Sequence, residues 1–300
     1  SHRRPTPRGG GVAIALVYLA VLPMLGFYGW LPWPMVIGLW GAGAVVGVVG
    51  FLDDHRHVAV RWRLLAHFAA AFWLLIWLPS LPQLSLFGNV YQLGWAGYLL
   101  GALLLVWLLN LFNFMDGIDA LASVEAITTC VGAALLYALA THTYFAAAPL
   151  LLAAAVAGFL VWNAPPARIF MGDSGSGFLG IVLGGLAFQA AWVAPQLLWG
   201  WLILLGVFIV DATVTLLHRA LRLDRVHEAH RNHAYQHATR AYDNPLLVTL
   251  AVLAINVLWL LPWACLVTLN LIDGALALII AYLPLVALAI RFRAGAPERP

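Results

Sequence analysis

The chain has 300 residues, of which 64% are hydrophobic and only 9% are charged, and its mean hydropathy is +0.93. A soluble domain carries about 25% charged residues, so this composition excludes an ordinary water-soluble enzyme and indicates a membrane protein. The formal net charge is +3, and all 15 basic residues are arginines. Cys130 and Cys265 lie inside apolar runs, where neither a disulfide framework nor a zinc site is expected.

Apolar runs recur along the whole chain and predict about ten membrane-spanning helices. We therefore expect an all-α polytopic helix bundle that forms one catalytic domain over residues 1–300. The expected spans are 11–27, 34–52, 64–78, 95–112, 121–140, 146–162, 176–193, 197–217, 246–269 and 272–290.

The connections between these spans differ in charge from one membrane face to the other. When the connections are assigned alternately to the two faces, every arginine falls on one of them, which the positive-inside rule makes cytoplasmic. Most of the 12 acidic residues lie in the same connections, although that rule does not require it. This clustering predicts an active site at the cytoplasmic surface. The segments on this face are 1–10, 53–63, 113–120, 163–175, 218–245 and 291–300.

Two of these segments carry paired carboxylates. Asp53 and Asp54 are adjacent at the cytoplasmic end of a span, which is costly near hydrocarbon unless the pair is hydrated, ion-paired or metal-bound. A solvated helix end is the alternative. Asp116 and Asp119 are three residues apart, so both would face one way if a helix begins there. Simple capping of a helix N-terminus is the alternative for this second pair.

The segment 163–175 combines a helix-ending pair of prolines with glycines and serines before the next span. Exposed backbone amides ahead of a helix would form a cradle for phosphate oxygens. Asp173 beside that cradle would let Mg²⁺ bridge protein and phosphate, because this ion prefers one or two carboxylates plus phosphate oxygens. A plain turn before a helix is the alternative.

The long segment 218–245 is rich in histidine and arginine. Anion binding by Arg231 and the histidines is the functional hypothesis, and an amphipathic helix on the lipid headgroups is the alternative. A zinc site is also conceivable, although neither cysteine nor acid completes a ligand set. Asp211, nearly a turn and a half inside the preceding span, is a functional candidate because ionisable groups are rare there. The segment's basic residues include His227, His230, Arg231, His233, His237 and Arg240.

Five ordered motifs resemble those of the polyprenyl-phosphate N-acetylhexosamine-1-phosphate transferases, which include the phospho-MurNAc-pentapeptide translocase. The form of the last motif resembles the branch that initiates O-antigen synthesis. The resemblance extends from Pro5 to about Gln236. The motifs are Pro-Thr-Pro-Arg-Gly-Gly-Gly (5–11), Phe-Leu-Asp-Asp (51–54), Asn-Phe-Met-Asp-Gly-Ile-Asp (113–119), Phe-Met-Gly-Asp-Ser-Gly-Ser (170–176) and His-Arg-Asn-His-Ala-Tyr-Gln (230–236).

The resemblance implies transfer of a sugar-1-phosphate from a UDP-N-acetylhexosamine to undecaprenyl phosphate, with release of UMP. It implies Mg²⁺ as the cofactor, with Mn²⁺ as an alternative, and a site on the cytoplasmic face of the bacterial inner membrane. Family members can form homodimers, and no nucleic-acid partner is expected. The family usually has a span before the first motif, so eleven spans are expected with a helix upstream of Ser1.

The resemblance also assigns residues. Asp53, Asp54, Asp116 and Asp173 become catalytic candidates, and Asp173 and Asp53 become metal ligands. Phe170 is expected to stack on uracil. The basic residue after the aspartate pair is usually lysine in the family, and here Arg61 or Arg63 takes its place, which changes the geometry of a phosphate contact. The substrate-binding candidates are Arg8, Arg61, Asn113, Asp119, Asn163, Phe170, Asp211, His230, Arg231 and His233.

Two other functions compete with this hypothesis. A secondary transporter would place its acids near the bilayer midplane, between paired broken helices, whereas these acids lie at one rim. A CDP-alcohol phosphatidyltransferase also uses aspartates and magnesium, but its long motif continues with alanine-arginine and further acids. The sequence Asp116-Gly-Ile-Asp-Ala-Leu-Ala does not continue in that way. The motifs do not distinguish which N-acetylhexosamine is transferred.

Overall fold

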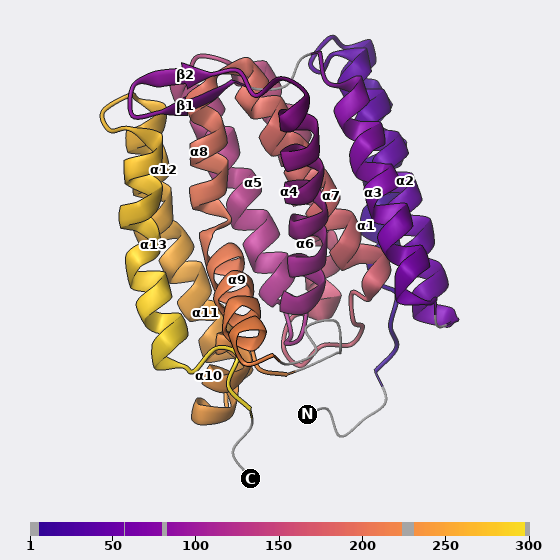
Figure 1. Cartoon of the computed structure of the whole chain (residues 1–300). Coiled ribbons are helices and arrows are strands. Elements are labelled where there is room, and N and C mark those ends of the chain that lie inside the picture. Colours follow the sequence, from indigo (N-terminus) through magenta and orange to yellow (C-terminus); the bar gives the residue numbers. More distant parts are fainter. Residues whose placement is uncertain (1–5, 57, 80–82, 224–230, 298–300) are drawn as a thin grey trace.

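Long apolar helices run between the two ends of the molecule in this computed structural model (Figure 1). The structure describes residues 6–56, 58–79, 83–223 and 231–297. A small β-hairpin lies across one end of the bundle, and the short helix α10 lies at the other (Figure 1).

The elements follow one another along the chain with short connections. They are α1 (Gly11–Phe27), α2 (Trp33–His55), α3 (Val60–Trp77), β1 (Leu84–Leu86), β2 (Asn89–Tyr91), α4 (Gly94–Met115), α5 (Leu121–Leu139), a 3₁₀ turn (Thr143–Ala146), α6 (Ala147–Asn163), α7 (Asp173–Val193), α8 (Pro195–Leu204), α9 (Gly206–Leu221), α10 (Ala234–Tyr242), α11 (Pro245–Ile255), a π-helical turn (Asn256–Leu260), α12 (Leu261–Thr268) and α13 (Gly274–Arg291).

The predicted all-α membrane bundle is confirmed. Within the described residues, eight helical segments are long and apolar enough to cross a membrane, or nine if the bent pair α8–α9 counts as one span. Helix α1, with 17 residues, is a shorter apolar helix. Each of the ten predicted spans therefore has a helical counterpart.

Three local expectations were wrong or incomplete. The predicted span 197–217 is not straight, because α8 and α9 meet at Leu205 with a bend of 70°. No helix begins at Asp116: α4 continues to Met115 and α5 starts only at Leu121, so Asp116 and Asp119 do not share a helix face. The antiparallel hairpin β1–β2, which pairs Leu84 with Tyr91, was not predicted, since its strands have three residues each.

Helix α7 forms the centre of the bundle. Buried residues make up 89% of its most apolar window, and it packs against α2 on one side and α4 on another. Its first residue is Asp173, so the most enclosed helix of the molecule begins at a candidate metal ligand. The rigid packing of α7 thereby fixes where the site can form.

Candidate active site

The cytoplasm-assigned end of α2 lies directly against the start of α7. A Cβ atom added at Gly50 would lie 2.6 Å from the Cα atom of Ser174, so only glycine permits this approach. Three and four residues further along, near the end of α2, Asp53 and Asp54 reach the first turn of α7. The glycine therefore explains why the aspartate pair can contact a helix that is about 120 residues away in sequence.

Asp54 caps the N-terminus of α7. Its two carboxylate oxygens accept hydrogen bonds from the backbone amides of Asp173, at 2.9 Å, and Ser174, at 3.1 Å. A carboxylate is favourable at this position because it meets both the unpaired amides and the positive end of the helix dipole. The expectation that these amides form an open phosphate cradle is therefore wrong in this structure, since a side chain of the protein occupies them.

Asp53 and Asp173 share one cationic partner. The Arg63 guanidinium contacts Asp53 Oδ2 and lies 3.2 Å from Asp173 Oδ2. Asn113 donates a hydrogen bond to the same Asp173 oxygen, also at 3.2 Å, and the Val58 amide donates to Asp53 at 2.7 Å. Side chains from α2, α3, α4 and α7 thus converge on one point, as the sequence analysis predicted for Asp53, Asn113 and Asp173.

Asp116 lies just beyond the end of α4 and faces the same cluster. Burial, together with the neighbouring carboxylates of Asp173 and Asp54, raises the pKa of Asp116 well above its ordinary value. The Arg8 guanidinium is near enough to oppose this rise in the pKa. Four acidic side chains and an N-terminal arginine therefore share one electrostatic environment.

The first motif is held beside Asp173 by its backbone. Phe170 N donates to Pro7 O at 2.9 Å, Gly10 N donates to Phe170 O at 3.0 Å, and Gly11 N donates to Met171 O at 2.9 Å. These bonds bring the segment before α1 alongside the segment before α7. They explain how Arg8 and Phe170, far apart in sequence, lie at the same end of the bundle.

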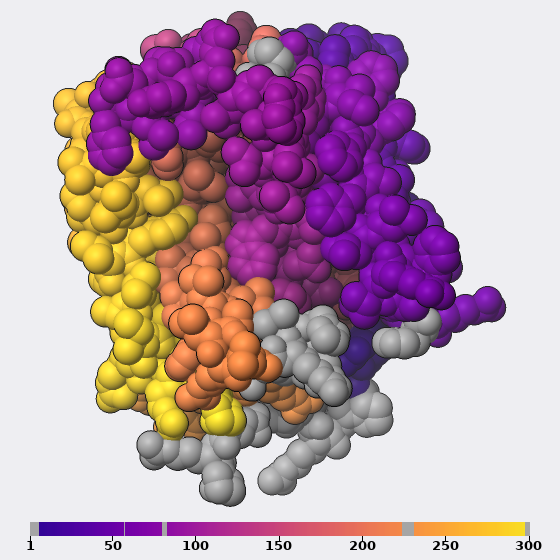
Figure 2. All heavy atoms as spheres, in the orientation of Figure 1, coloured from indigo at the N-terminus to yellow at the C-terminus, as the bar shows by residue number. Residues whose placement is uncertain are grey.

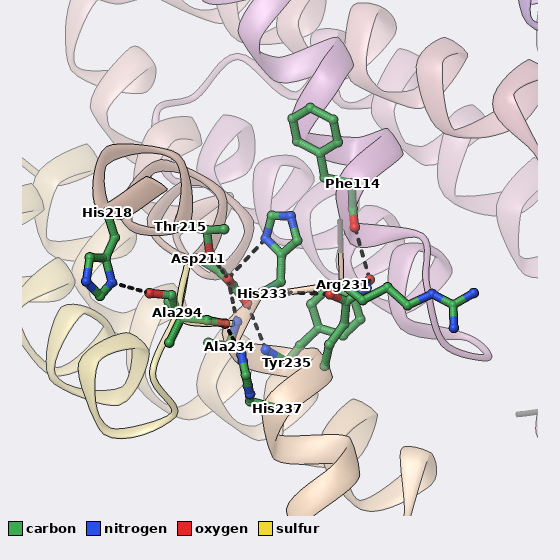
Figure 3. A network of polar contacts seen from close by, with 12 residues as sticks. Phe114, Asp211, Thr215, His218, Arg231, His233, Ala234, Tyr235, His237 and Ala294 are labelled. Carbon is green, nitrogen blue, oxygen red and sulfur yellow. Dashed lines mark hydrogen bonds and ion pairs between the residues drawn. The ribbon is translucent and has the colours of Figure 1, made fainter. Parts of the chain in front are cut away.

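A second polar network, around Asp211, holds the histidine-containing motif (Figure 3). The buried Asp211 carboxylate accepts from the amides of Ala234 and Tyr235, both at 2.9 Å, and lies 3.3 Å from His233 Nδ1. Thr215 Oγ1 donates to the same carboxylate at 3.2 Å. These contacts describe an anchor for the start of α10, so the substrate-binding role of Asp211 stays a prediction that they do not support.

Tyr235 connects this network to the third motif. Its hydroxyl donates to Phe114 O at 3.0 Å, and a Cβ atom at Gly117 would clash with that hydroxyl. The Phe114 and His233 rings are stacked with their centroids 5.9 Å apart. Sequence reasoning missed Tyr235, although its position two residues after His233 in a recognised motif was the available signal.

The C-terminal segment packs across α9 and α10. His218 Nδ1 is 2.7 Å from Ala294 O, His237 Nε2 is 3.2 Å from Ala296 O, and Gly295 N donates to the carbonyl of Asn232 at 2.7 Å. Burial and the nearby Arg240 charge lower the pKa of His237 and so favour its neutral ring. A neutral ring with its proton on Nε2 can still donate to Ala296 O. The described histidines of segment 218–245, His218, His233 and His237, thus contact backbone carbonyls or Asp211.

The other predicted residues that the structure describes make contacts outside the Asp53–Asp173 cluster. Asn163 accepts from Ala120 N at 2.9 Å and donates to Ile169 O at 3.0 Å, and Asp119 accepts from Ala167 N at 2.9 Å, so these contacts join two loops. Arg61 is exposed and lies over the Trp62 ring, and the Arg231 side chain is also exposed. Their roles in substrate binding stay predictions. His230 lies outside the described residues.

The donor set suits a divalent cation that shares its ligands with phosphate. Within the described ranges, no group of three or more His, Cys, Asp or Glu side chains forms a closed metal cage. Asp53 and Asp173 nevertheless converge on a single positive group, the Arg63 guanidinium, which shows that one cation can satisfy both. Because Mg²⁺ typically takes one or two carboxylates and completes its shell with phosphate and water, these residues fit it.

The family model for glycosyl transferase family 4 matches residues 36–191, slightly more than half of the chain. The chain belongs to glycosyl transferase family 4. The matched region contains the aspartate pair of α2, the loop after α4 and the first turn of α7. Membership of family 4 supports neither the transporter nor the CDP-alcohol phosphatidyltransferase considered above.

Curated relatives are similar over most of this family 4 chain. It is 27% identical over 241 residues to a probable undecaprenyl-phosphate N-acetylglucosaminyl 1-phosphate transferase of Bacillus subtilis (strain 168), covering 78% of the chain and 66% of the relative. It is 32% identical over 220 residues to a phospho-N-acetylmuramoyl-pentapeptide-transferase of Picosynechococcus, covering 69% and 58%. It is 29% identical over 273 residues to a decaprenyl-phosphate N-acetylglucosaminephosphotransferase of Mycolicibacterium smegmatis, covering 77% and 66%. The chain spans between about half and two thirds of the length of the curated relatives it matches.

Proposed function

We propose that the chain transfers an N-acetylhexosamine-1-phosphate from a UDP-sugar to undecaprenyl phosphate in a magnesium-dependent reaction. UMP is released, and the lipid-linked diphosphate sugar formed would start O-antigen or a related glycan. The observation that carries this proposal is the convergence of Asp53, Asp173, Asn113 and Arg63 from four helices at one end of a membrane bundle. Relatives named for transferring N-acetylglucosamine phosphate to polyprenyl phosphates support it.

The reaction forms a bond between an oxygen of the lipid phosphate and the β-phosphorus of the UDP-sugar. The bond from that phosphorus to the bridging oxygen breaks, and the oxygen leaves with UMP. Such transfers depend mainly on positioning and on neutralising charge at the phosphoryl oxygens. When bound, Mg²⁺ would neutralise diphosphate oxygens beside Asp173 and Asp53.

The two adjacent aspartates have different roles in this proposal. A phosphate monoester has a second pKa of about 6, so the lipid phosphate is already largely dianionic near neutral pH and needs no strong base. Asp54 holds the first turn of α7 through its amide bonds. Asp53 faces Arg63 and Asp173, so it orients the attacking phosphate and the cation.

The remaining roles follow from the positions of the loops. Arg63 would contact phosphate oxygens, Phe170 would stack on uracil, and the segment around His233 would bind the donor. Arg8, Asn113 and Asp116 would complete the donor pocket. The arginine-rich end of the bundle would face the cytoplasm from the bacterial inner membrane, where both UDP-sugars and the lipid phosphate are accessible.

The test is UMP release by the purified protein with Mg²⁺, undecaprenyl phosphate and a panel of UDP-N-acetylhexosamines. Asp173→Asn should lower the rate at least about 100-fold, the size expected when one electrostatic group at a transition state is lost. Asp243→Asn is the matched control, because Asp243 is an exposed residue in the left-handed region that asparagine tolerates. Near-normal turnover of folded Asp173→Asn protein, or sugar uptake into proteoliposomes without UMP formation, would contradict the proposal.

A further inference from the structure

The chain turns sharply at the end of α13. The helix ends at Arg291, and Arg293 follows in the left-handed region with a φ of 56°. The amides of Arg293 and Ala294 donate to carbonyls in the last turn of the helix, both at 2.9 Å. This pairing is a Schellman motif, which ends a helix and satisfies its last carbonyls. We call residues 293–297, which follow it, the C-terminal strap.

The strap packs on the last turn of α9. His218 Nδ1 lies 2.7 Å from Ala294 O, and since a carbonyl oxygen can only accept, this ring nitrogen carries the proton (Figure 3). Gly295 has a φ of 79°, and a Cβ atom there would lie 2.8 Å from both Thr215 O and His218 Cβ. Ala294 is only 2% exposed. The strap is therefore in close contact with α9, at a point where a side chain larger than that of glycine does not fit.

The same strap contacts the histidine-containing segment 231–242. Gly295 N donates to Asn232 O at 2.7 Å, just before α10 begins. Within α10, His237 Nε2 lies 3.2 Å from Ala296 O. The strap thus joins the end of α9 to this segment through two separate hydrogen bonds.

The first of these bonds is one residue away from a predicted donor-binding histidine. Asn232 precedes His233, whose ring stacks on Phe114 with the centroids 5.9 Å apart. Phe114 follows Asn113, which donates to the Asp173 carboxylate. A displacement of Asn232 would therefore move His233 relative to the carboxylate cluster.

The strap is a second support for this segment, separate from Asp211. The Asp211 carboxylate accepts from the amides of Ala234 and Tyr235 at the start of α10, whereas the strap bonds to the carbonyl before it and to a side chain further along. A helix of nine residues has little stability of its own, so both supports contribute to its position. The five motifs do not include His218 or Gly295, which is why the sequence analysis did not identify this support.

We propose that His218 and Gly295 are positioning residues that hold the C-terminal strap on α9, and that the strap fixes the His233 segment beside the active site. The part of this inference that concerns catalysis rests on the proposed function. The part that concerns the position of the segment does not.

Hydrogen exchange of residues 231–242 in the ligand-free full chain tests whether the strap holds this segment. His218→Leu removes the donor to the strap, and Gly295→Ala forces a Cβ atom against α9. Each should accelerate exchange in the segment about fivefold or more, the size expected when one buried hydrogen bond is lost.

Two variants at neighbouring positions serve as controls for these changes. His218→Asn should stay within about twofold of the parent, because its side-chain N–H group can replace the Nδ1–H donor. Leu217→Ala, at a 59% exposed position on the same turn of α9, should also leave the exchange of residues 231–242 unchanged.

Kinetics separate positioning from loss of folded protein. His218→Leu and Gly295→Ala should raise the KM for the UDP-sugar about fivefold or more and leave the KM for undecaprenyl phosphate within about twofold, since the His233 segment is proposed to bind the donor. A smaller folded fraction would instead lower the maximal rate and change neither KM. His218→Asn should restore the KM of the parent.

Unchanged exchange of residues 231–242 in both His218→Leu and Gly295→Ala would overturn the proposal. Acceleration spread equally over all helices would also overturn it, because that pattern reports global destabilisation, and so would equal damage in His218→Asn. Local acceleration with an unchanged KM for the UDP-sugar would refute the part that concerns catalysis. If the parent releases no UMP, the proposed function fails, while the exchange rates still decide whether the strap holds the segment.

Discussion

Arg63, rather than Arg61, is the arginine that meets the carboxylates. The sequence did not show which of the two arginines takes the place of the family's lysine, because both follow the aspartate pair closely. The structure distinguishes them because helix α3 begins at Val60, and residues two apart on a helix point in nearly opposite directions. Arg63 consequently faces Asp53 and Asp173, whereas Arg61 lies exposed on Trp62.

We predict that Arg63→Gln lowers the rate of UMP release about 100-fold, because it removes the positive group shared by two carboxylates at the proposed phosphate site. Arg61→Gln is the matched control and should change the rate less than about threefold, as is usual for an exposed charge. Initial rates at saturating and limiting UDP-sugar give both kcat and KM. Equal losses in the two variants would refute the assignment of Arg63.

The sequence predicted which acids gather but not what each one contacts. Carboxylates near hydrocarbon require partners, and that requirement identified Asp53, whereas Asp173 was identified by its place beside glycines and serines ahead of a helix. The capping of α7 by Asp54 depends on the approach of α2 at Gly50, and the loop contacts of Asn163 and Asp119 depend on how two distant loops meet. These contacts join segments that are far apart in the sequence, so no local sequence pattern predicts them.

At the scale of elements, α10 is held mainly from outside. It has nine residues, too few for a stable isolated helix, so its position depends on tertiary contacts. Asp211 on α9 accepts hydrogen bonds from its first two amides, and Tyr235 adds a bond to the Phe114 carbonyl near the end of α4. The apolar pattern predicted α9 as part of a span. Such a pattern indicates that a segment is buried in the membrane but not whether its helix is straight. The break between α8 and α9 and the contact of α9 with α10 could therefore not be predicted.

We predict that Asp211→Ala loosens α10 in the ligand-free protein. Two backbone amides and a hydroxyl lose their buried acceptor, which should lower the free energy of unfolding by about 1–3 kcal/mol. Hydrogen exchange of residues 231–242 should accelerate, and Asp211→Asn, which keeps one acceptor oxygen, should show a smaller effect.

The outcome also decides between the two roles considered for Asp211. Unchanged exchange in the ligand-free Asp211→Ala protein, together with a raised KM for the UDP-sugar, would favour direct substrate binding instead. Asp243→Asn, at the exposed end of α10, serves as the control for nonspecific loosening.

At the scale of the whole molecule, the hairpin and the carboxylate cluster lie at opposite ends of the bundle. Figure 2 shows the hairpin across the upper end and α9 near the lower end of the same face. The bundle was predictable because apolar runs of this length suit membrane-spanning helices, which satisfy their backbone hydrogen bonds internally. The hairpin was not, because its two strands are short and lie between spans.

We predict opposite accessibility for the two ends in intact cells. In a protein whose native cysteines are replaced by alanine, a membrane-impermeant maleimide should label Phe87→Cys from outside the inner membrane. It should label Leu221→Cys only after that membrane is permeabilised, since arginine-rich ends stay on the cytoplasmic side. Both positions are exposed, so packing does not bias the comparison. The reverse pattern would place the carboxylate cluster on the wrong side for cytosolic nucleotide sugars.

The contact between Asp54 and the first amides of α7 has a consequence for inhibitor selectivity. A resident negative charge already satisfies the helix terminus, so small inorganic anions have no vacant dipole to exploit there. Under the proposed function, the UDP-sugar is recognised instead by groups spread over several helices and loops. Compounds that join a base to a charged linker and span those separate groups are therefore the inhibitors that the proposed function predicts.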